Sequence, residues 1–155
     1  TWDDGHDPYV QPVDIVDSVL QASMGMPCKL VVITGGEPMR QNLSVIVPML
    51  IEHGFNVQIE TSGSLWQDGL EGAFFVISPK TPKVALKFRD LEHNVAWKYV
   101  LKEGEVAFDA RQIYIQPCDE QDLDINAANL RAVTQSSLQC GHTASVQLHK
   151  VLELE

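Results

Sequence analysis

Residues 34–38, Thr-Gly-Gly-Glu-Pro, directly follow a short apolar run at residues 30–33, Leu-Val-Val-Ile. The apolar run predicts a strand that is buried on both faces, as strands of parallel sheets are. Glycine at positions 35 and 36 lets the backbone turn sharply there and approach a ligand closely. Carbonyl groups at such a strand end accept hydrogen bonds from an ammonium group, and the Glu37 carboxylate adds negative charge beside them. Alternatively, Gly-Gly is a plain strand-to-helix turn and Glu37 is a first-turn acid facing the helix dipole.

Polar or flexible residues also follow three other predicted strands. They are residues 61–63 (Thr-Ser-Gly), 78–80 (Ser-Pro-Lys) and 116–119 (Gln-Pro-Cys-Asp). The carboxyl ends of parallel strands meet on one side of a barrel or sheet, so we expect these segments to lie near residues 34–37. Together they offer acceptors for an ammonium, donors for a carboxylate, and amide and hydroxyl groups for a ribose and a base. This set favours an amino-acid-bearing nucleoside over a bare phosphate, and the chain contains neither G-x-x-x-x-G-K nor G-x-G-x-x-G.

The hydrophobic pattern predicts the elements that position these groups. Strands are expected at residues 30–34, 55–61, 73–78, 95–101, 113–115 and 145–149, and helices at residues 13–24, 43–51 and 122–140. Pro48 is expected to kink the second helix, because proline removes a hydrogen bond from a helix interior. Leu130 and Val133 are expected on the inner side of the last helix.

Strands that alternate with helices or crossovers predict an α/β fold with mostly parallel strands and right-handed connections. The segment between Leu101 and Arg111 has room for only about one or two turns of helix, so the helix layer is expected to be incomplete. The sequence shows no repeat and no linker, and we interpret residues 1–155 as a single domain.

The composition narrows the class of partner. The chain has 155 residues and a formal net charge of −10, which argues against nucleic acid as the main partner, because phosphate binding needs a basic surface. The sequence contains no run of 18 apolar residues, so no membrane span is expected, and it shows no signal peptide. We therefore expect a cytoplasmic protein that acts on a small molecule.

The chain also lacks the usual spacing of a metal or disulfide site. Cys28, Cys118 and Cys140 lie 90 and 22 residues apart, which fits neither a disulfide set nor a zinc or cluster motif. We expect three free thiols in a reducing compartment. The acidic stretch at residues 122–126 lacks the later Gly and Glu of a calcium loop and is interpreted as the start of a helix.

Five segments, in order along the chain, resemble those of one family. They are residues 34–38, 58–63 (Gln-Ile-Glu-Thr-Ser-Gly), 78–80, 116–119 and 147–150 (Gln-Leu-His-Lys). The first resembles the Gly-Gly-Glu motif of radical S-adenosylmethionine enzymes. The whole set resembles the 7-carboxy-7-deazaguanine synthase family within that superfamily.

The resemblance implies a lyase reaction of queuosine and 7-deazapurine biosynthesis, in which 6-carboxy-5,6,7,8-tetrahydropterin is rearranged to 7-carboxy-7-deazaguanine with loss of ammonia. It implies S-adenosylmethionine, a [4Fe–4S] cluster and Mg²⁺ as the family's cofactors, and a homodimer. It also implies a modified partial (β/α) barrel. In such enzymes the protein binds, orients and shields, while the cofactors supply the radical chemistry.

The resemblance also implies roles for individual residues. Those expected to bind S-adenosylmethionine are Gly35, Gly36, Glu37, Gly63, Ser78, Pro79, Lys80, Gln116, Pro117, Cys118 and Asp119. Those expected at the pterin substrate are Thr61, His149 and Glu155, the last of which occupies the place of the family's final residue. Without the resemblance, His149 is a lone histidine with a structural role.

One feature of the superfamily is absent. Its cluster is ligated by a C-x₃-C-x₂-C-type loop before the Gly-Gly-Glu strand, and this chain has no such loop. We therefore interpret the chain as truncated, without the first strand, the cluster loop or the Mg²⁺-binding threonine, and as inactive in this form. The alternatives are a non-catalytic remnant that binds a nucleoside or a partner protein, and another radical S-adenosylmethionine enzyme such as an activating enzyme.

Overall fold

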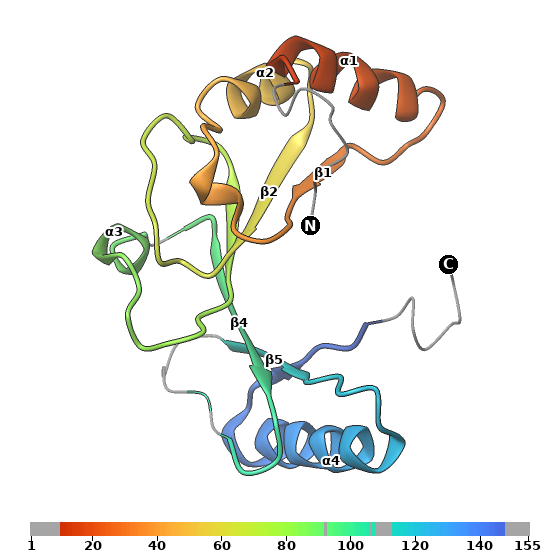
Figure 1. Ribbon diagram of the computed structural model, residues 1–155, viewed down its shortest axis with the longest axis vertical. Coiled ribbons are helices and arrows are strands. Elements are labelled where there is room, and N and C mark those ends of the chain that lie inside the picture. The colour runs from red at the N-terminus through yellow and green to blue at the C-terminus, as the bar shows by residue number, and fades with distance from the viewer. Residues whose placement is uncertain (1–9, 92, 106, 108–112, 148–155) are drawn as a thin grey trace, which may run out of the picture.

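The computed structural model describes residues 10–91, 93–105, 107 and 113–147 (Figure 1). The first five predicted strands and the three predicted helices are confirmed, with shifts of one to a few residues at their ends, whereas the short helix Leu86–Arg89 was not predicted. The elements are α1 (Pro12–Ala22), β1 (Leu30–Ile33), the 3₁₀ helix η1 (Pro38–Arg40), α2 (Ile46–Glu52), β2 (Asn56–Thr61), β3 (Phe74–Ile77), α3 (Leu86–Arg89), β4 (Val95–Leu101), β5 (Ile113–Pro117), α4 (Leu123–Cys140) and β6 (Thr143–Ala144).

The six strands form one fully parallel sheet in the order β1-β2-β3-β4-β5-β6. The predicted α/β class is therefore confirmed, and within the described residues the sheet is an open arc rather than a closed barrel. Helices α1 and α2 lie at one end of the arc and α4 at the other (Figure 1). The helix layer is incomplete as predicted, because α3, between β3 and β4, has only four residues. No helix in the described part of the chain is both long and apolar enough to cross a membrane.

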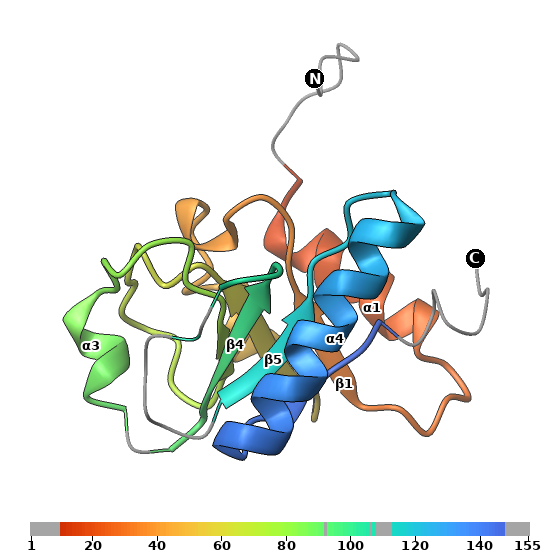
Figure 2. The ribbon, with the colours of Figure 1, turned by 90° about the horizontal axis from the view of Figure 1, so that it is seen from below.

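The two faces of the sheet differ in cover and in composition. One face is apolar and carries Val57, Ile59, Phe75, Ile77, Trp97, Tyr99, Ile113 and Ile115, each at most 4% exposed. Buried side chains of all four helices belong to the same core: Val16, Val47, Leu50, Phe88 and Val133. Helix α4 runs alongside β5 (Figure 2). The core therefore lies on one side of the sheet.

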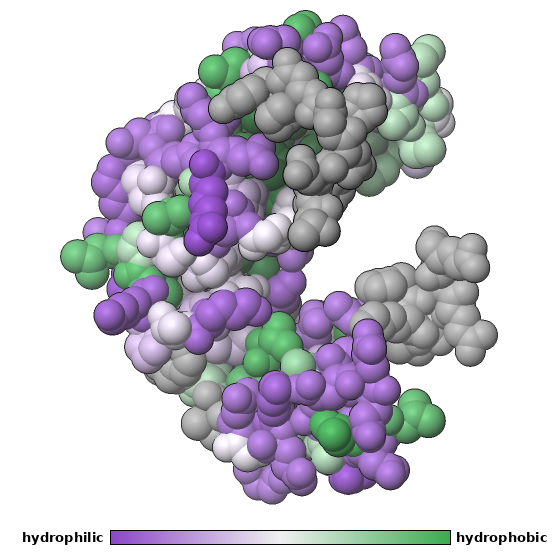
Figure 3. All heavy atoms as spheres, viewed as in Figure 1, coloured by the Kyte–Doolittle hydropathy of each residue, from purple (hydrophilic) through white to green (hydrophobic). Residues whose placement is uncertain are grey.

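The opposite face, here called the open face, carries residues that alternate with those of the core. The half-buried polar residues on it are Gln58, Glu60, Lys98, Tyr114 and Gln116. Because the helices lie around the outside of the arc, this face lines its inner side. Figure 3 shows a deep hollow in the molecular surface there, between the α1–α2 end and the α4 end.

The structure corrects the prediction that the first strand is buried on both faces. Leu30 and Val32 of β1 are 50% and 43% exposed, whereas Val31 and Ile33 pack against the core. Within the described residues β1 pairs with β2 alone, and no helix covers the open face on which Leu30 and Val32 lie. An apolar strand sequence alone does not distinguish a central strand from one at the edge of a sheet.

Three predictions about the helices and the last strand also need correction. Helix α2 begins at Ile46 rather than at residue 43, so Pro48 lies in its first turn, where a missing N–H costs no hydrogen bond within the helix, and not in a helix interior as predicted. Leu130 is 48% exposed, whereas Val133 is buried as predicted. The last strand, β6, ends at Ala144, and one further hydrogen bond from Ser145 N to Ile115 O (2.8 Å) extends its contact with β5.

The start and end of α4 agree with the interpretation of residues 122–140 as a helix. The Asp122 carboxylate caps the helix by accepting hydrogen bonds from Asp124 N and Ile125 N, both at 3.0 Å. Gly141 follows the last helical residue with a left-handed φ of +73°. The acidic stretch therefore begins a helix, as the sequence indicated, and does not form a calcium loop.

Candidate functional site

The parallel sheet places the predicted polar segments at the same edge. Residues 34–37 follow β1, residues 61–63 end and follow β2, residues 78–80 follow β3, and residues 116–119 end and follow β5. Backbone hydrogen bonds fix adjacent segments to one another, such as Ser78 N to Thr61 O (2.7 Å). The expectation that these groups lie along one edge is therefore confirmed.

Glu37 is the most connected acidic residue at this edge. Its carboxylate accepts hydrogen bonds from Thr61 Oγ1 (2.6 Å), Ser62 N (3.0 Å) and Ser62 Oγ, which join the end of β1 to the end of β2. It also accepts from Met39 N (3.2 Å) and so caps the short helix η1. The alternative interpretation of Glu37 as an acid at a helix start thus describes one of its contacts, while the contacts to β2 were not predictable from sequence.

The same hydrogen bonds determine the charge of Glu37. Burial alone would raise the pKa of this carboxyl group, but the hydrogen bonds from Ser62, Thr61 and Met39 outweigh burial and hold the pKa below its ordinary value. At neutral pH the edge therefore carries a fixed negative charge close to the carbonyl groups of residues 34–36. This arrangement suits an ammonium group.

Thr61 and Gly63, at the end of β2 and just after it, are closely surrounded by other residues. Thr61 is 4% exposed, and its hydroxyl donates to Glu37 and accepts from Gly63 N (3.1 Å). A Cβ atom on Gly63 would lie 2.7 Å from Ile77 Cγ2, and its φ of +74° is one that other residues rarely adopt. The turn after β2 therefore requires glycine at position 63, and the Thr61 hydroxyl keeps one lone pair for a further partner.

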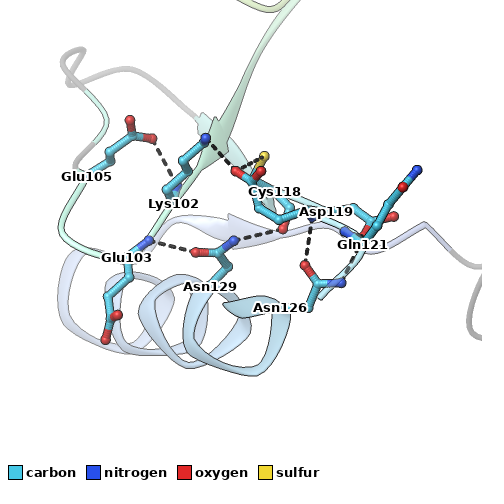
Figure 4. A network of polar contacts seen from close by, with 9 residues as sticks. Lys102, Glu103, Glu105, Cys118, Asp119, Gln121, Asn126 and Asn129 are labelled. Carbon is cyan, nitrogen blue, oxygen red and sulfur yellow. Dashed lines mark hydrogen bonds and ion pairs between the residues drawn. The ribbon is translucent and has the colours of Figure 1, made fainter. Parts of the chain in front are cut away.

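A buried amide holds the end of β5 in place (Figure 4). Asn129 on α4 is 1% exposed; its Oδ1 accepts from Glu103 N (2.8 Å) and its Nδ2 donates to Cys118 O (2.9 Å). One side chain thus joins the loops that follow β4 and β5. Asn126, one helical turn earlier, donates from Nδ2 to Asp119 Oδ1 (2.8 Å) and accepts from Glu120 N (2.8 Å).

Cys118 lies near Lys102 (Figure 4), whose exposed ammonium forms an ion pair with the half-buried carboxylate of Glu120. Its Sγ donates to Glu120 Oε1 at 3.6 Å. Burial, and then the hydrogen bond and charge of Glu120, raise the pKa of the thiol above its ordinary value. At neutral pH Cys118 is therefore a protonated thiol.

The described residues do not fit an iron–sulfur cluster. Cys28 precedes the amino end of β1, Cys118 follows the carboxyl end of β5, and Cys140 is the last residue of α4. All three are free thiols, as predicted. No group of three or more His, Cys, Asp or Glu side chains in the described part of the chain is arranged to hold a metal ion, which applies to Mg²⁺ as well.

The remaining predicted residues are only partly placed. Lys80 is exposed in the turn after β3, beside half-buried Ser78 and Pro79. His149 and Glu155 lie outside the described residues. Sequence reasoning missed Gln67, whose Nε2 donates to Met39 O (2.7 Å) and to Gln41 O and whose Oε1 accepts from Leu43 N (3.0 Å). It also missed Asn129, and neither residue belongs to a periodic pattern or a motif that would have identified it.

Known proteins resemble this chain both in sequence and in structure. No family model matches the chain. The 7-carboxy-7-deazaguanine synthase of Rickettsia prowazekii is 34% identical over 140 residues, which cover 81% of this chain and 59% of the relative. The protein of the same name from Rhodospirillum rubrum is 30% identical over 178 residues, covering 92% of this chain and 72% of the relative. The crystal structure of QueE from Escherichia coli superposes with a TM-score of 0.66 at 20% identity, covering 89% of this chain and 64% of QueE.

The structural match defines the class: the chain is an α/β protein with the sheet and helix arrangement of QueE. The sequence matches are more specific, and the chain belongs to the 7-carboxy-7-deazaguanine synthase family. The resemblance inferred from the segments at the strand ends is thereby confirmed. The chain spans 59% and 60% of the length of the relatives from Rickettsia prowazekii and Caulobacter vibrioides.

Removing the charge of Glu37 should make the free energy of unfolding depend less on pH in the acidic range. Because the folded pKa lies below the ordinary value of 4.5, the hydrogen bonds stabilise the fold fully above that pH and are lost as pH falls through the lower folded value. Glu37→Gln should lower the free energy of unfolding at pH 7 by about 1.5–3 kcal/mol, and the deficit should shrink as the pH drops below about 4.5. Urea unfolding between pH 3 and pH 7 measures this. A deficit that is constant with pH, or equal to that of Glu52→Gln at the exposed end of α2, would contradict the role of Glu37.

Replacing each of the two asparagines of α4 by alanine compares the stability contributed by a buried side-chain amide, Asn129, with that contributed by a half-buried one, Asn126. Both Asn129→Ala and Asn126→Ala gain the same helix propensity. Asn129→Ala removes a side chain that is 1% exposed and its hydrogen bonds to Glu103 N and Cys118 O, so it should cost about 2–4 kcal/mol, against about 1 kcal/mol for Asn126→Ala. Chemical unfolding of the two variants gives the comparison. Equal losses would show that the Asn129 bridge is not a principal link between α4 and the strand ends.

Proposed function

We propose that this chain is the S-adenosylmethionine-binding part of a 7-carboxy-7-deazaguanine synthase. The activity proposed for the whole enzyme is the conversion of 6-carboxy-5,6,7,8-tetrahydropterin into 7-carboxy-7-deazaguanine with loss of ammonia. Family membership supports this activity. The observation that carries the assignment to this chain is the row of strand-end groups along one edge, with an ionised Glu37 at one end of it.

The described residues offer a complementary group for each part of S-adenosylmethionine. Glu37 and the nearby carbonyl groups suit the ammonium of its methionine end. Gly35 and Gly36 have no other atoms within 4 Å of the place a Cβ would take, so the backbone there is open to close approach by a ligand. Residues 78–80 and 116–119 supply the hydroxyl, cation, amide and carbonyl groups that would bind the adenosine, and Asn129 and Asn126 hold the second of these segments in place.

The pterin substrate is proposed to lie next to the same edge, where the Thr61 hydroxyl has its free lone pair. His149 and Glu155 are assigned to the substrate by family resemblance alone. S-adenosylmethionine supplies radical chemistry in enzymes that also hold a [4Fe–4S] cluster. The three cysteines described here are not placed to ligate such a cluster. A cytoplasmic homodimer acting on a small molecule is part of the same proposal.

Titration with S-adenosylmethionine tests the assignment of the strand-end groups. The parent chain should bind it, and Glu37→Ala and Lys80→Ala should each weaken binding about ten- to a hundred-fold, because each removes a charged hydrogen-bonding group. Lys83→Ala, in the same exposed segment but outside the proposed site, is the matched control and should bind like the parent. Calorimetry that finds no binding by the parent, or unchanged affinity in both site variants, would overturn the assignment.

The 155-residue chain should form no [4Fe–4S] cluster. Cluster iron needs thiolates within reach of one another, and the three cysteines lie at opposite ends of the sheet and at the end of α4. Anaerobic reconstitution with iron and sulfide, followed by absorption and electron paramagnetic resonance spectroscopy, should show no stoichiometric cluster. A cluster that survives gel filtration would mean that these cysteines come together in a way the sheet does not allow.

A further inference from the structure

A charged pair lies on the open face of the sheet, apart from the strand-end groups discussed above. Lys98 Nζ on β4 is 3.0 Å from Glu60 Oε2 on β2, so the two side chains meet across β3. Gln58 Nε2 donates to the other oxygen, Glu60 Oε1, at 3.2 Å. The exposed fractions of the Lys98 and Glu60 side chains are 20% and 31%. The pair is thus largely withdrawn from solvent on a face that no helix covers in the described part of the chain.

Packing of the sheet does not explain this pair. Lysine and glutamate are depleted from strands, and withdrawing two charges from water costs free energy that their mutual attraction only partly returns. The Lys98 ammonium has three N–H donors, and Glu60 is the one partner recorded for it among the described residues. Glu60, in contrast, is held at both oxygens. The arrangement therefore fixes an ammonium in place and leaves part of its donor capacity for a ligand.

The position and charge of Lys98 indicate what that ligand carries. Glu60 directly precedes Thr61, and Lys98 lies three residues before the end of β4, so the pair is within about 10 Å of the strand-end edge. Lys98 is the one lysine or arginine among the described strand residues of the open face. The chain has a net charge of −10, so most of its charged groups repel an anion. The Lys98 ammonium would attract an anionic group that enters the hollow.

We propose that Lys98 binds the carboxylate of a ligand seated against the open face, and that Glu60 and Gln58 hold its ammonium in position. The inference rests on the proposed function, because both S-adenosylmethionine and the 6-carboxytetrahydropterin substrate carry a carboxylate. A phosphate is less suited, since one ammonium without a ring of backbone N–H donors makes a poor phosphate site.

Paired ligands with and without the carboxylate distinguish the two sources. The first pair is 6-carboxypterin and pterin, and the second is S-adenosylmethionine and 5′-methylthioadenosine. Their affinities are measured for the parent chain and for Lys98→Met, which keeps the length and apolar stem of the side chain but removes the charge. In one of the two pairs, Lys98→Met should lose about ten-fold or more in affinity for the carboxylate-bearing member and almost nothing for the other member.

Two further variants keep the test decisive. Lys98→Gln retains a hydrogen bond to Glu60 and replaces Lys98→Met if that variant does not fold. Lys83→Met removes an exposed lysine from the loop after β3 and should leave all four affinities unchanged.

Each outcome has a distinct meaning. If the parent binds none of the four compounds, the proposed function fails, and this inference fails with it. If the parent binds but both members of each pair weaken equally in the Lys98 variants, Lys98 has only a structural role and the carboxylate subsite is wrong. Unchanged affinities in folded Lys98 variants would likewise overturn it. Loss confined to a carboxylate-bearing ligand identifies which ligand Lys98 holds.

Discussion

One carboxylate joins the two strands on which the candidate site depends. Glu37 lies beyond the end of β1 and accepts hydrogen bonds from the hydroxyl of Thr61, at the end of β2, and from the hydroxyl and backbone N–H of Ser62. The glycine turn that precedes it is thereby fixed against the neighbouring strand, although β1 has only one partner strand among the described residues. A ligand at this edge therefore meets groups whose positions are already set, and little ordering is needed on binding.

The unequal cover of the two sheet faces explains where charge and apolar surface are found. Helices on the outer side bury the apolar residues of β2 to β5, so stability comes from that side. No helix of the described residues lies on the inner side, and the side chains there are free to be polar. The same alternation along each strand therefore supplies both the core and the polar surface, and a shift of one residue in strand register would exchange them.

Much of the fold followed from local patterns in the sequence. Strands β1 to β5 and the helix at residues 123–140 were predictable because apolar runs and helical spacing are local properties. Burial of β1 was not, since it depends on which elements lie beside that strand. The place of Glu37 at a strand end was predictable, but its contacts to residues 61 and 62 were not, because they join positions 24 and 25 residues apart. Gln67 and Asn129 hold backbone groups of other segments, and such contacts leave no periodic trace in a sequence.

The order of the strands in the sheet also bears on how the protein is made. Each strand pairs with the one that precedes it in the chain, from β1 to β6, so every pairing closes a short stretch of polypeptide. During synthesis on the ribosome, the segment from α1 to β3 can assemble its part of the core while later residues are still being added. Helix α4, in contrast, packs against β5 and β6, which lie on either side of it in sequence. Helix α4 can therefore complete its packing only after β6 has been synthesised, and it then joins the same core as the earlier helices.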